Sequence, residues 1–383
     1  MVIEYLSSNL DIKEHLKRVG VDGGGINILA SKAKVHILHI RDMHVGAANI
    51  LKQDALSIGA DLAVPRGTVI AATPKVDVTL IATTKQLQIL AKKELSQPFG
   101  LKDLAVKLQE YAAMKKPKVV EIMGVLNAND DSFFARSRFS AAGATELIEK
   151  MIDDGASIID IGAVSSRPGA PKVSCSEERE RFEPIAKLIK EERLYEKASF
   201  SCDSYEPEVL RVALDSGFTI VNDITGLADD EVCRLAAAYE AKVVIMHMQG
   251  TPQTMQINPR YENILDDVYT FLDKRVQKAE SFGIKDIILD IGVGFGKSLE
   301  DNLMLIKNLE HFMTLQKPLL VGVSRKSMID KISPSTVEDR LAGSLTLHLE
   351  AMRNGASILR VHDVYEHAQA IKVQEAIDSL QVL

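Results

Sequence analysis

Several features that would assign this 383-residue chain to a specialised class are scarce or missing. Its three cysteines, Cys175, Cys202 and Cys233, are too few and too widely spaced for a disulfide framework or a CxxC metal site, which favours a reducing cytoplasm. No run of ~18 uncharged apolar residues is present, so we expect no membrane-spanning segment. The N-terminus also lacks the charged and then apolar pattern of a signal peptide.

Basic residues are also fewer than acidic residues in this chain. The chain has 46 Lys and Arg against 53 Asp and Glu, a formal net charge of -7. A general nucleic-acid-binding surface is not expected at that balance, so any anionic ligand must be held by a local basic cluster. The hydrophobic content of 46% and the charged content of 26% are ordinary for a globular protein, and the length exceeds one typical domain.

The chain is expected to divide near residue 115. Residues 1–115 carry 15 basic and 11 acidic residues (+4), whereas the remaining 268 carry 31 and 42 (-11). The junction Met114–Pro117 is polar and contains proline, as domain boundaries often do. We therefore predict a small α+β N-terminal domain over 1–115, with its role open, and a larger domain over 116–383.

Periodicity in the first domain predicts strands at Val35–Ile40 and Val76–Ala82 and helices at Val45–Ile58 and Thr84–Leu95. Three histidines at positions 36, 39 and 44 do not suit a metal site, because residues three apart on a strand face opposite sides. The segment Asp22–Gly25 is expected to be a plain turn.

The second domain alternates β-branched runs with helical stretches eight times. This alternation predicts an α/β fold, namely a (β/α)8 TIM barrel, because the length of the domain is close to the about 250 residues typical of that fold. A doubly wound sheet is the alternative. The predicted strands are Val119–Leu126, Ser157–Ile161, Ala198–Cys202, Thr219–Val221, Lys242–Met246, Asp286–Leu289, Pro318–Val321 and Ser357–Val361.

Polar residues end each predicted strand, where barrel enzymes carry their sites. Helix capping is the alternative for any single residue. Acceptors such as Asp203, Asn222 and Asp290 suit a ring rich in N–H groups, and Lys326 adds a donor. Arg360 and His362 share one face of a strand and, with Arg167, form a candidate anion clamp. The pattern predicts a polar heterocycle beside a phosphate group.

The glycine-rich segment Gly292–Ser298 looks like a phosphate loop but fails the test for one. Ile291 stands where a P-loop needs its first glycine, and Lys297 stands where the GxGxxG fingerprint needs its last. Gly294 and Gly296 are expected instead to allow close approach of the backbone.

A series of short segments in order along residues 118–378 resembles the dihydropteroate synthase family, the folate-pathway enzymes inhibited by sulfonamides. The segments are Met123–Asn127, Asp131–Phe133, Asp160–Gly162, Ser165–Ala170, Cys202–Asp203, Asn222–Ile224, Met246–Met248, Gly250–Pro252, Gly294–Lys297, Ser324–Ser327, Arg340–Gly343 and Arg360–Asp363. The resemblance implies that para-aminobenzoate is joined to 6-hydroxymethyl-7,8-dihydropterin pyrophosphate, with release of pyrophosphate.

The resemblance also implies roles for particular residues. The pterin would be held by Asp203, Asn222, Asp290 and Lys326. Pyrophosphate would be held by Arg360, His362, Asn127, Ser166 and Arg167, with Asn127 also a ligand of Mg2+. Ser327, Pro168 and Phe133 would contact para-aminobenzoate. The expected catalytic residues are Asp203, Lys326, Arg360 and His362, and no strong general base is expected.

Some positions depart from the family pattern. The first loop has Ala128–Asp130 and lacks the usual Thr, Pro and glycine pair, and the second has Ala163 and Val164 in place of Gly and Glu. These changes concern loop closure, whereas the residues assigned to pterin and phosphate are intact.

Two other functions are open. A pterin-binding methyltransferase barrel shares the pterin residues but needs no pyrophosphate clamp, and a non-catalytic barrel would only bind pterin.

The resemblance implies a homodimer in the cytoplasm, without nucleic-acid or membrane partners. Four leucines of the predicted helix Arg340–Asn354, at 341, 345, 347 and 349, could serve a dimer face or pack on the barrel.

Overall fold

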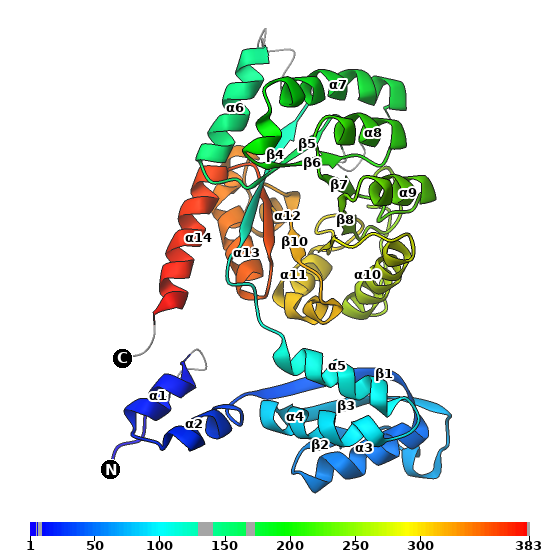
Figure 1. Cartoon of the computed structure of the whole chain (residues 1–383), viewed down its shortest axis with the longest axis vertical. Helices are drawn as coiled ribbons and strands as arrows, with labels where there is room; N and C mark the ends of the chain where they lie inside the picture. The colour runs from blue at the N-terminus through cyan, green and yellow to red at the C-terminus, as the bar shows by residue number, and fades with distance from the viewer. Residues whose placement is uncertain (5, 7–9, 129–140, 166–172, 381–383) are drawn as a thin grey trace. The chain divides into compact units, whose positions relative to one another are not determined.

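The computed structural model describes residues 1–383 apart from 5, 7–9, 129–140, 166–172 and 381–383. The chain forms two compact units. One comprises Met1–Lys115 and Ile377–Leu383, and the other Lys116–Ala376. Figure 1 labels their helices and strands.

The larger unit is built on a closed barrel of eight parallel strands, in the order β10-β11-β4-β5-β6-β7-β8-β9. Strand β11 pairs with β4, which closes the ring. The predicted (β/α)8 barrel is therefore confirmed, and the doubly wound sheet is wrong. The strands are β4 Glu121–Asn127, β5 Ile158–Gly162, β6 Ser199–Asp203, β7 Ile220–Asp223, β8 Lys242–Met246, β9 Ile287–Asp290, β10 Leu319–Val321 and β11 Ile358–Val361.

The strands are apolar over most of their length because the barrel interior and the surrounding helices bury both faces. One interior layer is a cluster contributed by seven of the strands, with all its members at most 3% exposed: Met123, Ile158, Ile220, Val244, Ile288, Leu320 and Ile358. This apolar layer fills the barrel below the polar strand ends.

Helices surround the barrel, as Figure 1 shows. Side-chain caps start several of them; Ser298, for example, forms a capping box with Asp301 at α11. The helices are α6 Ala141–Asp153, α7 Cys175–Glu191, α8 Pro207–Asp215, α9 Asp230–Ala238, α10 Ile264–Ser281, α11 Leu299–Lys307, α12 Ser327–Ile332, α13 Leu341–Arg353 and α14 Val364–Ser379, with short 3-10 helices η4 Leu194–Glu196, η5 Leu309–Leu315 and η6 Glu338–Arg340.

The smaller unit is an α+β fold around a three-stranded antiparallel sheet in the order β1-β3-β2. Buried apolar residues of the helices pack on the sheet, with Leu51, Leu80, Leu87, Leu90 and Leu101 fully buried. The elements are α1 Ile12–Arg18, α2 Gly23–Ala30, β1 Val35–His44, α3 Val45–Ser57, β2 Asp61–Ala63, η1 Thr68–Ile70, β3 Lys75–Thr83, α4 Thr84–Lys93, η2 Glu94–Ser96 and α5 Leu101–Ala113.

One local prediction for this unit is wrong, and one predicted strand is confirmed but is longer than expected. Asp22 does not open a plain turn: its side chain accepts a hydrogen bond from Gly24 N at 2.9 Å and caps α2, which begins at Gly23. Strand β1 continues past Ile40 to His44 through an irregularity at which Asp42 adopts a φ of 55°.

Two of the three histidines of β1, His36 and His44, have structural partners. His36 lies 2.7 Å from Thr84 Oγ1 and 3.2 Å from Tyr111 Oη, and the His44 ring accepts from Gly46 N at the start of α3. In the described part of the chain, no helix has the length and apolar character needed to cross a bilayer.

Candidate active site

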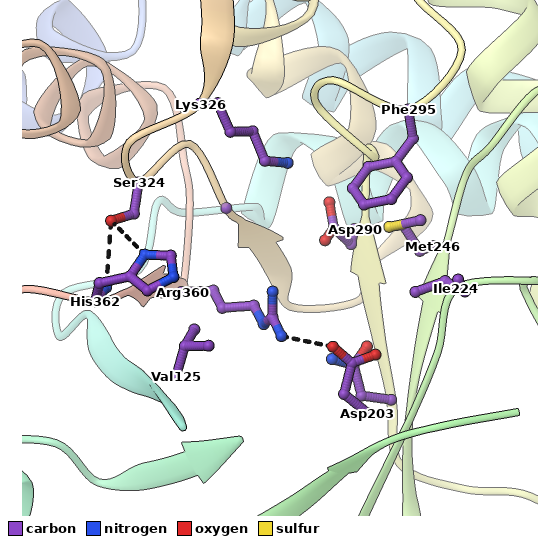
Figure 2. A pocket seen from close by; sticks show the side chains of 12 residues that line it. Val125, Asp203, Ile224, Met246, Asp290, Phe295, Ser324, Lys326, Arg360 and His362 are labelled. Carbon is purple, nitrogen blue, oxygen red and sulfur yellow. Dashed lines mark hydrogen bonds and ion pairs between the residues drawn. The ribbon is translucent and has the colours of Figure 1, made fainter. Parts of the chain in front are cut away.

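Six of the predicted site residues meet in one pocket at the carboxyl ends of the barrel strands (Figure 2). They come from the ends of separate strands and the loops that follow them, which is the convergence expected when parallel strands close into a barrel. The pocket is lined by Val125, Asp203, Asn222, Ile224, Met246, Asp290, Phe295, Gly322, Ser324, Lys326, Arg360 and His362.

Arg360 is bound by two carboxylates. Its Nε donates to Asp160 Oδ2 at 2.7 Å, and its Nη2 lies 2.5 Å from the same oxygen and 2.7 Å from Asp203 Oδ2. Figure 2 shows the side chain reaching across the pocket to Asp203. Asn222 Nδ2 also donates to both oxygens of Asp160, at 3.2 Å each. Asp160, which is fully buried, therefore anchors both Arg360 and Asn222.

The electrostatics follow from two carboxylates sharing one guanidinium. Burial raises the pKa of Asp203 to about 7. The positive charge of Arg360 lowers this pKa, and the negative charge of Asp160 raises it further. Burial alone would lower the pKa of Arg360, but Asp160 and Asp203 raise it above its ordinary value, so Arg360 stays charged. The pocket thus contains fixed positive charge beside a carboxyl group whose pKa is raised by burial.

Asp290 and Lys326 occupy another side of the pocket. Asp290 Oδ1 accepts from Gly292 N at 2.7 Å, so this residue caps its turn and also lines the pocket. Burial raises its pKa, against the lowering effect of Lys326. Burial lowers the pKa of Lys326 to about 8, against the raising effect of Asp290. The Lys326 ammonium donates to Val293 O and lies 4.7 Å from the centre of the Phe295 ring.

The glycine-rich loop after β9 is held by a buried lysine. Lys297 Nζ donates to three backbone oxygens, those of His247 at 3.2 Å, Gly292 at 2.8 Å and Phe295 at 2.9 Å. It is a structural residue of the loop, which agrees with the rejection of a P-loop. Gly296 has a φ of 64°, and a Cβ there would lie 2.5 Å from Gln249 O, so close backbone approach is confirmed for this glycine.

Two loops meet where the strands β10 and β11 end. Ser324 Oγ accepts from His362 N at 3.2 Å and lies 3.0 Å from His362 Nδ1. Arg325 donates to both oxygens of Asp363, at 3.0 Å from Nε and 2.5 Å from Nη2. Figure 2 shows Ser324 and His362 together at one edge of the pocket.

Two predicted residues that the structure describes, Asn127 and Ser327, do not line this pocket. Asn127 ends β4 and is half-buried, and Ser327 is exposed at the first turn of α12. Phe133, Ser166, Arg167 and Pro168 lie outside the described residues.

Asp160 lies in a segment that carries the family resemblance but was not among the predicted site residues. Its signal was a carboxylate inside a barrel strand, which needs a buried partner. Reasoning from polar residues also missed the apolar walls, Ile224, Met246 and Phe295, since only the fold shows which apolar side chains face the pocket.

Comparison with known proteins identifies relatives of both the barrel and the whole chain. Residues 123–362 match the family described as pterin binding enzyme. The chain is 41% identical over 378 residues to a bifunctional dihydropteroate synthase/dihydropteroate reductase of Helicobacter pylori, covering 99% of each chain. It is 42% identical over 265 residues to a dihydropteroate synthase of Haemophilus influenzae, covering 67% of this chain and 94% of the relative.

Solved structures resemble the barrel. Yersinia pestis dihydropteroate synthase in a sulfonamide drug complex matches with a TM-score of 0.65 and 33% identity, over 70% of this chain and 98% of that one. The Thermus thermophilus enzyme in complex with 4-aminobenzoate matches with a TM-score of 0.61 and 38% identity, over 68% of this chain and 95% of that one.

Proposed function

The chain belongs to the dihydropteroate synthase family of pterin-binding enzymes, and on that premise we propose how its barrel divides the reaction among its residues. The enzyme is a transferase of folate biosynthesis. It condenses 6-hydroxymethyl-7,8-dihydropterin pyrophosphate with para-aminobenzoate to give 7,8-dihydropteroate. The C–O bond to pyrophosphate breaks, pyrophosphate leaves with the electron pair, a C–N bond forms to the aryl amine, and the nitrogen then loses one proton to water or to the departing pyrophosphate. We propose that residues 116–383 make up this catalytic domain.

The pterin subsite comprises Asp203, Asn222, Asp290 and Lys326. The observation that carries this assignment is the convergence of these four side chains, from separate elements, on one pocket. Carboxylate and amide oxygens accept from the N–H groups of the ring, and Lys326 donates to a ring oxygen or nitrogen. The apolar side chains Ile224, Met246 and Phe295 supply the walls that a flat heterocycle requires.

The pyrophosphate subsite comprises Arg360 and His362, with Asn127, Ser166 and Arg167 as further contacts. Two nitrogens of Arg360 are already bound by Asp160 and Asp203, which holds its side chain in place. Among the residues that the structure describes, no acceptor pairs with its Nη1, so that group can donate to a phosphate oxygen. Charge-assisted hydrogen bonds of this kind are the strong ones for phosphate.

Mg2+ is part of the proposal, with Asn127 as its protein ligand. The side chain of Asn127 has no hydrogen-bond partner within the described ranges, and it ends β4 at the mouth of the barrel. A single amide oxygen fits Mg2+, which usually keeps waters and takes phosphate oxygens as its other ligands. When bound, Mg2+ would neutralise charge that develops on the departing pyrophosphate.

The catalytic residues are proposed to act by electrostatics. Arg360 and His362 stabilise the leaving pyrophosphate, and Asp203 stabilises positive charge on the pterin as the bond breaks. Preorganised groups of this kind are typically worth about 3 kcal/mol each. Lys326 orients the ring. The aryl amine of para-aminobenzoate is unprotonated at neutral pH and attacks without a general base. Phe133, Pro168 and Ser327 are proposed to contact para-aminobenzoate.

The test is a coupled assay of pyrophosphate release with both substrates and Mg2+, alongside detection of dihydropteroate. Turnover that needs both substrates supports the proposal. Methyl transfer to a corrinoid protein without dihydropteroate would support the methyltransferase alternative. Binding of the pterin pyrophosphate by calorimetry, without turnover, would support a non-catalytic barrel.

Reduction of dihydropteroate is a second candidate activity, and it concerns the N-terminal unit. The relative that covers 99% of this chain is named as a synthase and a reductase, whereas the Haemophilus influenzae synthase covers only 67%. Reduction adds a hydride to C6 and a proton to N5 of the pterin, and the electrons come from a reduced nicotinamide or flavin. Oxidation of such a donor by dihydropteroate, present with the full chain and absent with residues 116–383, would support it.

We also propose a cytoplasmic homodimer. Cys175, Cys202 and Cys233 are free thiols, which supports a reducing compartment. The leucines of α13 at 341, 345, 347 and 349 are half-buried, which fits packing on the barrel and leaves part of each side chain for a partner. Analytical ultracentrifugation would decide the oligomeric state.

A further inference from the structure

We propose that His348 and His367 are positioning residues that tie the loop after β10 to the loop after β11 and thereby set the pyrophosphate subsite. The inference rests on the subsite proposed above, because the loop after β11 carries His362 and the loop after β10 carries Ser324, which contacts it. His348 lies on α13 and His367 on α14, and neither lines the pocket.

A continuous line of hydrogen bonds runs through the two rings. Val323 N donates to His348 Nε2 at 3.2 Å, so that nitrogen is an acceptor and the proton of the neutral ring is on Nδ1. His348 Nδ1 lies 2.8 Å from His367 Nε2, which must then accept. His367 Nδ1 lies 2.6 Å from Asp363 O and donates to it. With both rings neutral, only this direction gives every nitrogen a partner.

The rings are buried deeply enough to act as a fixed connection. His348 is 0% exposed and His367 is 1% exposed, and each ring nitrogen has a partner. Burial is the main cause that lowers the pKa of both rings, so both stay uncharged at neutral pH. A fully satisfied buried network of this kind holds its members in one arrangement.

The two ends of this line adjoin pocket residues. Val323 precedes Ser324, and Asp363 follows His362, so the histidine pair lies behind the Ser324–His362 contact. The bidentate pair of Arg325 with Asp363 ties the same two loops a second time. A shift of either loop would move His362, directly or through Ser324, relative to Arg360 of the proposed pyrophosphate subsite.

The same two helices carry a second cross-link that serves as a matched control. Arg353 of α13 donates to Gln374 Oε1 of α14 at 2.8 Å, and Gln374 is buried. This link lies one to two turns further toward the C-terminal end of each helix, and neither of its residues lines the pocket. If both cross-links only hold the two helices together, loss of either one should have the same effect on pyrophosphate binding. If the histidine pair positions the two loops, only its loss should weaken pyrophosphate binding.

The experiment compares His348→Leu, His348→Gln and Gln374→Leu in the full chain. Calorimetry with inorganic pyrophosphate and Mg2+ gives the Kd, and thermal unfolding gives the Tm. His348→Leu removes both hydrogen bonds and should weaken pyrophosphate binding about tenfold, as expected for a displaced site group. His348→Gln keeps an acceptor and a donor and should restore most of the affinity. Gln374→Leu should lower the Tm and leave the Kd unchanged.

Equal Kd values for His348→Leu and Gln374→Leu, or no recovery with His348→Gln, would overturn the inference. If His348→Leu does not fold, 15N NMR of the unaltered protein decides, since both rings must be neutral with the proton on Nδ1. A ring in the other tautomer would reject the hydrogen-bond direction. Failure of the proposed function is distinct: the unaltered chain would then show no synthase turnover or bind no pyrophosphate.

Discussion

Replacing Arg360 with alanine is expected to have two separable effects, on ligand binding and on stability. If Arg360 holds the leaving group, Arg360→Ala loses a charge-assisted hydrogen bond worth about 1.5–3 kcal/mol to the pterin pyrophosphate. That corresponds to a loss of affinity of about 10- to 150-fold. The free pterin alcohol has no pyrophosphate, so its affinity should change much less.

The stability effect comes from the carboxylates that Arg360 leaves behind. Asp160 is 0% exposed and Asp203 is 13% exposed, and both are bound by this guanidinium. Removing one partner of a buried ion pair costs about 3–5 kcal/mol, and the 24% exposure of Arg360 places the expected cost at the low end. A loss of about 3 kcal/mol lowers the Tm of a domain of this size by about 6 °C or more.

Calorimetry with both ligands and thermal unfolding measure the two effects. The double variant Arg360→Ala/Asp160→Asn is the control, because it removes one unpaired carboxylate and should recover part of the lost stability without recovering pyrophosphate affinity. Equal losses of affinity for the pyrophosphate and the alcohol would remove Arg360 from the phosphate subsite. An unchanged Tm would refute the reasoning about the buried carboxylates.

Four further outcomes are expected. Asp290→Asn presents an N–H to a ring N–H and should weaken pterin binding by about 1–3 kcal/mol with the fold intact; normal binding by calorimetry would mean that this residue only caps its turn. Because the pKa of Lys326 is lowered to about 8, its charge and its contribution to pterin affinity should fall as pH rises through that value, and Lys326→Met should lose that component in a pH titration of Kd. Lys297→Met leaves three backbone carbonyls without their donor and should cost about 3 kcal/mol in a denaturant titration; a loss smaller than about 1 kcal/mol would mean that the loop is held otherwise. Residues 116–383 alone should keep the KM for both synthase substrates and lose stability or solubility, whereas a soluble barrel with a raised KM for para-aminobenzoate would falsify a purely structural role of residues 1–115 in synthesis.

The barrel and much of its site could be predicted from the sequence because each buried parallel strand has a recognisable pattern of residues. Burial on both faces makes each strand a short apolar run, and closure brings all eight carboxyl ends to one rim. Polar residues that end those runs therefore had to lie together, and Asp203, Asn222, Asp290, Arg360 and His362 do. The prediction needed only the strand order along the chain.

Local capping was less predictable. The glycines after Asp22 suggested a turn, but the capping carboxylate at the first amide groups stabilises a helix there. The sequence by itself offers both outcomes, because glycine permits either backbone and only the surrounding contacts favour one of them.

Pairings across the barrel were decided by the tertiary structure alone. Asp160 and Arg360 are 200 residues apart, and His348 and His367 lie on different helices. Which side chains meet depends on strand register, helix rotation and rotamers, none of which follows from the residue types. The role of Lys297 was likewise not predictable from the sequence. Its position in a glycine-rich segment resembles that of a phosphate-binding lysine, whereas in the structure it donates to three backbone carbonyls. The sequence determined which groups are present at the mouth of the barrel, and packing determined which of them face the ligand and which hold the others in place.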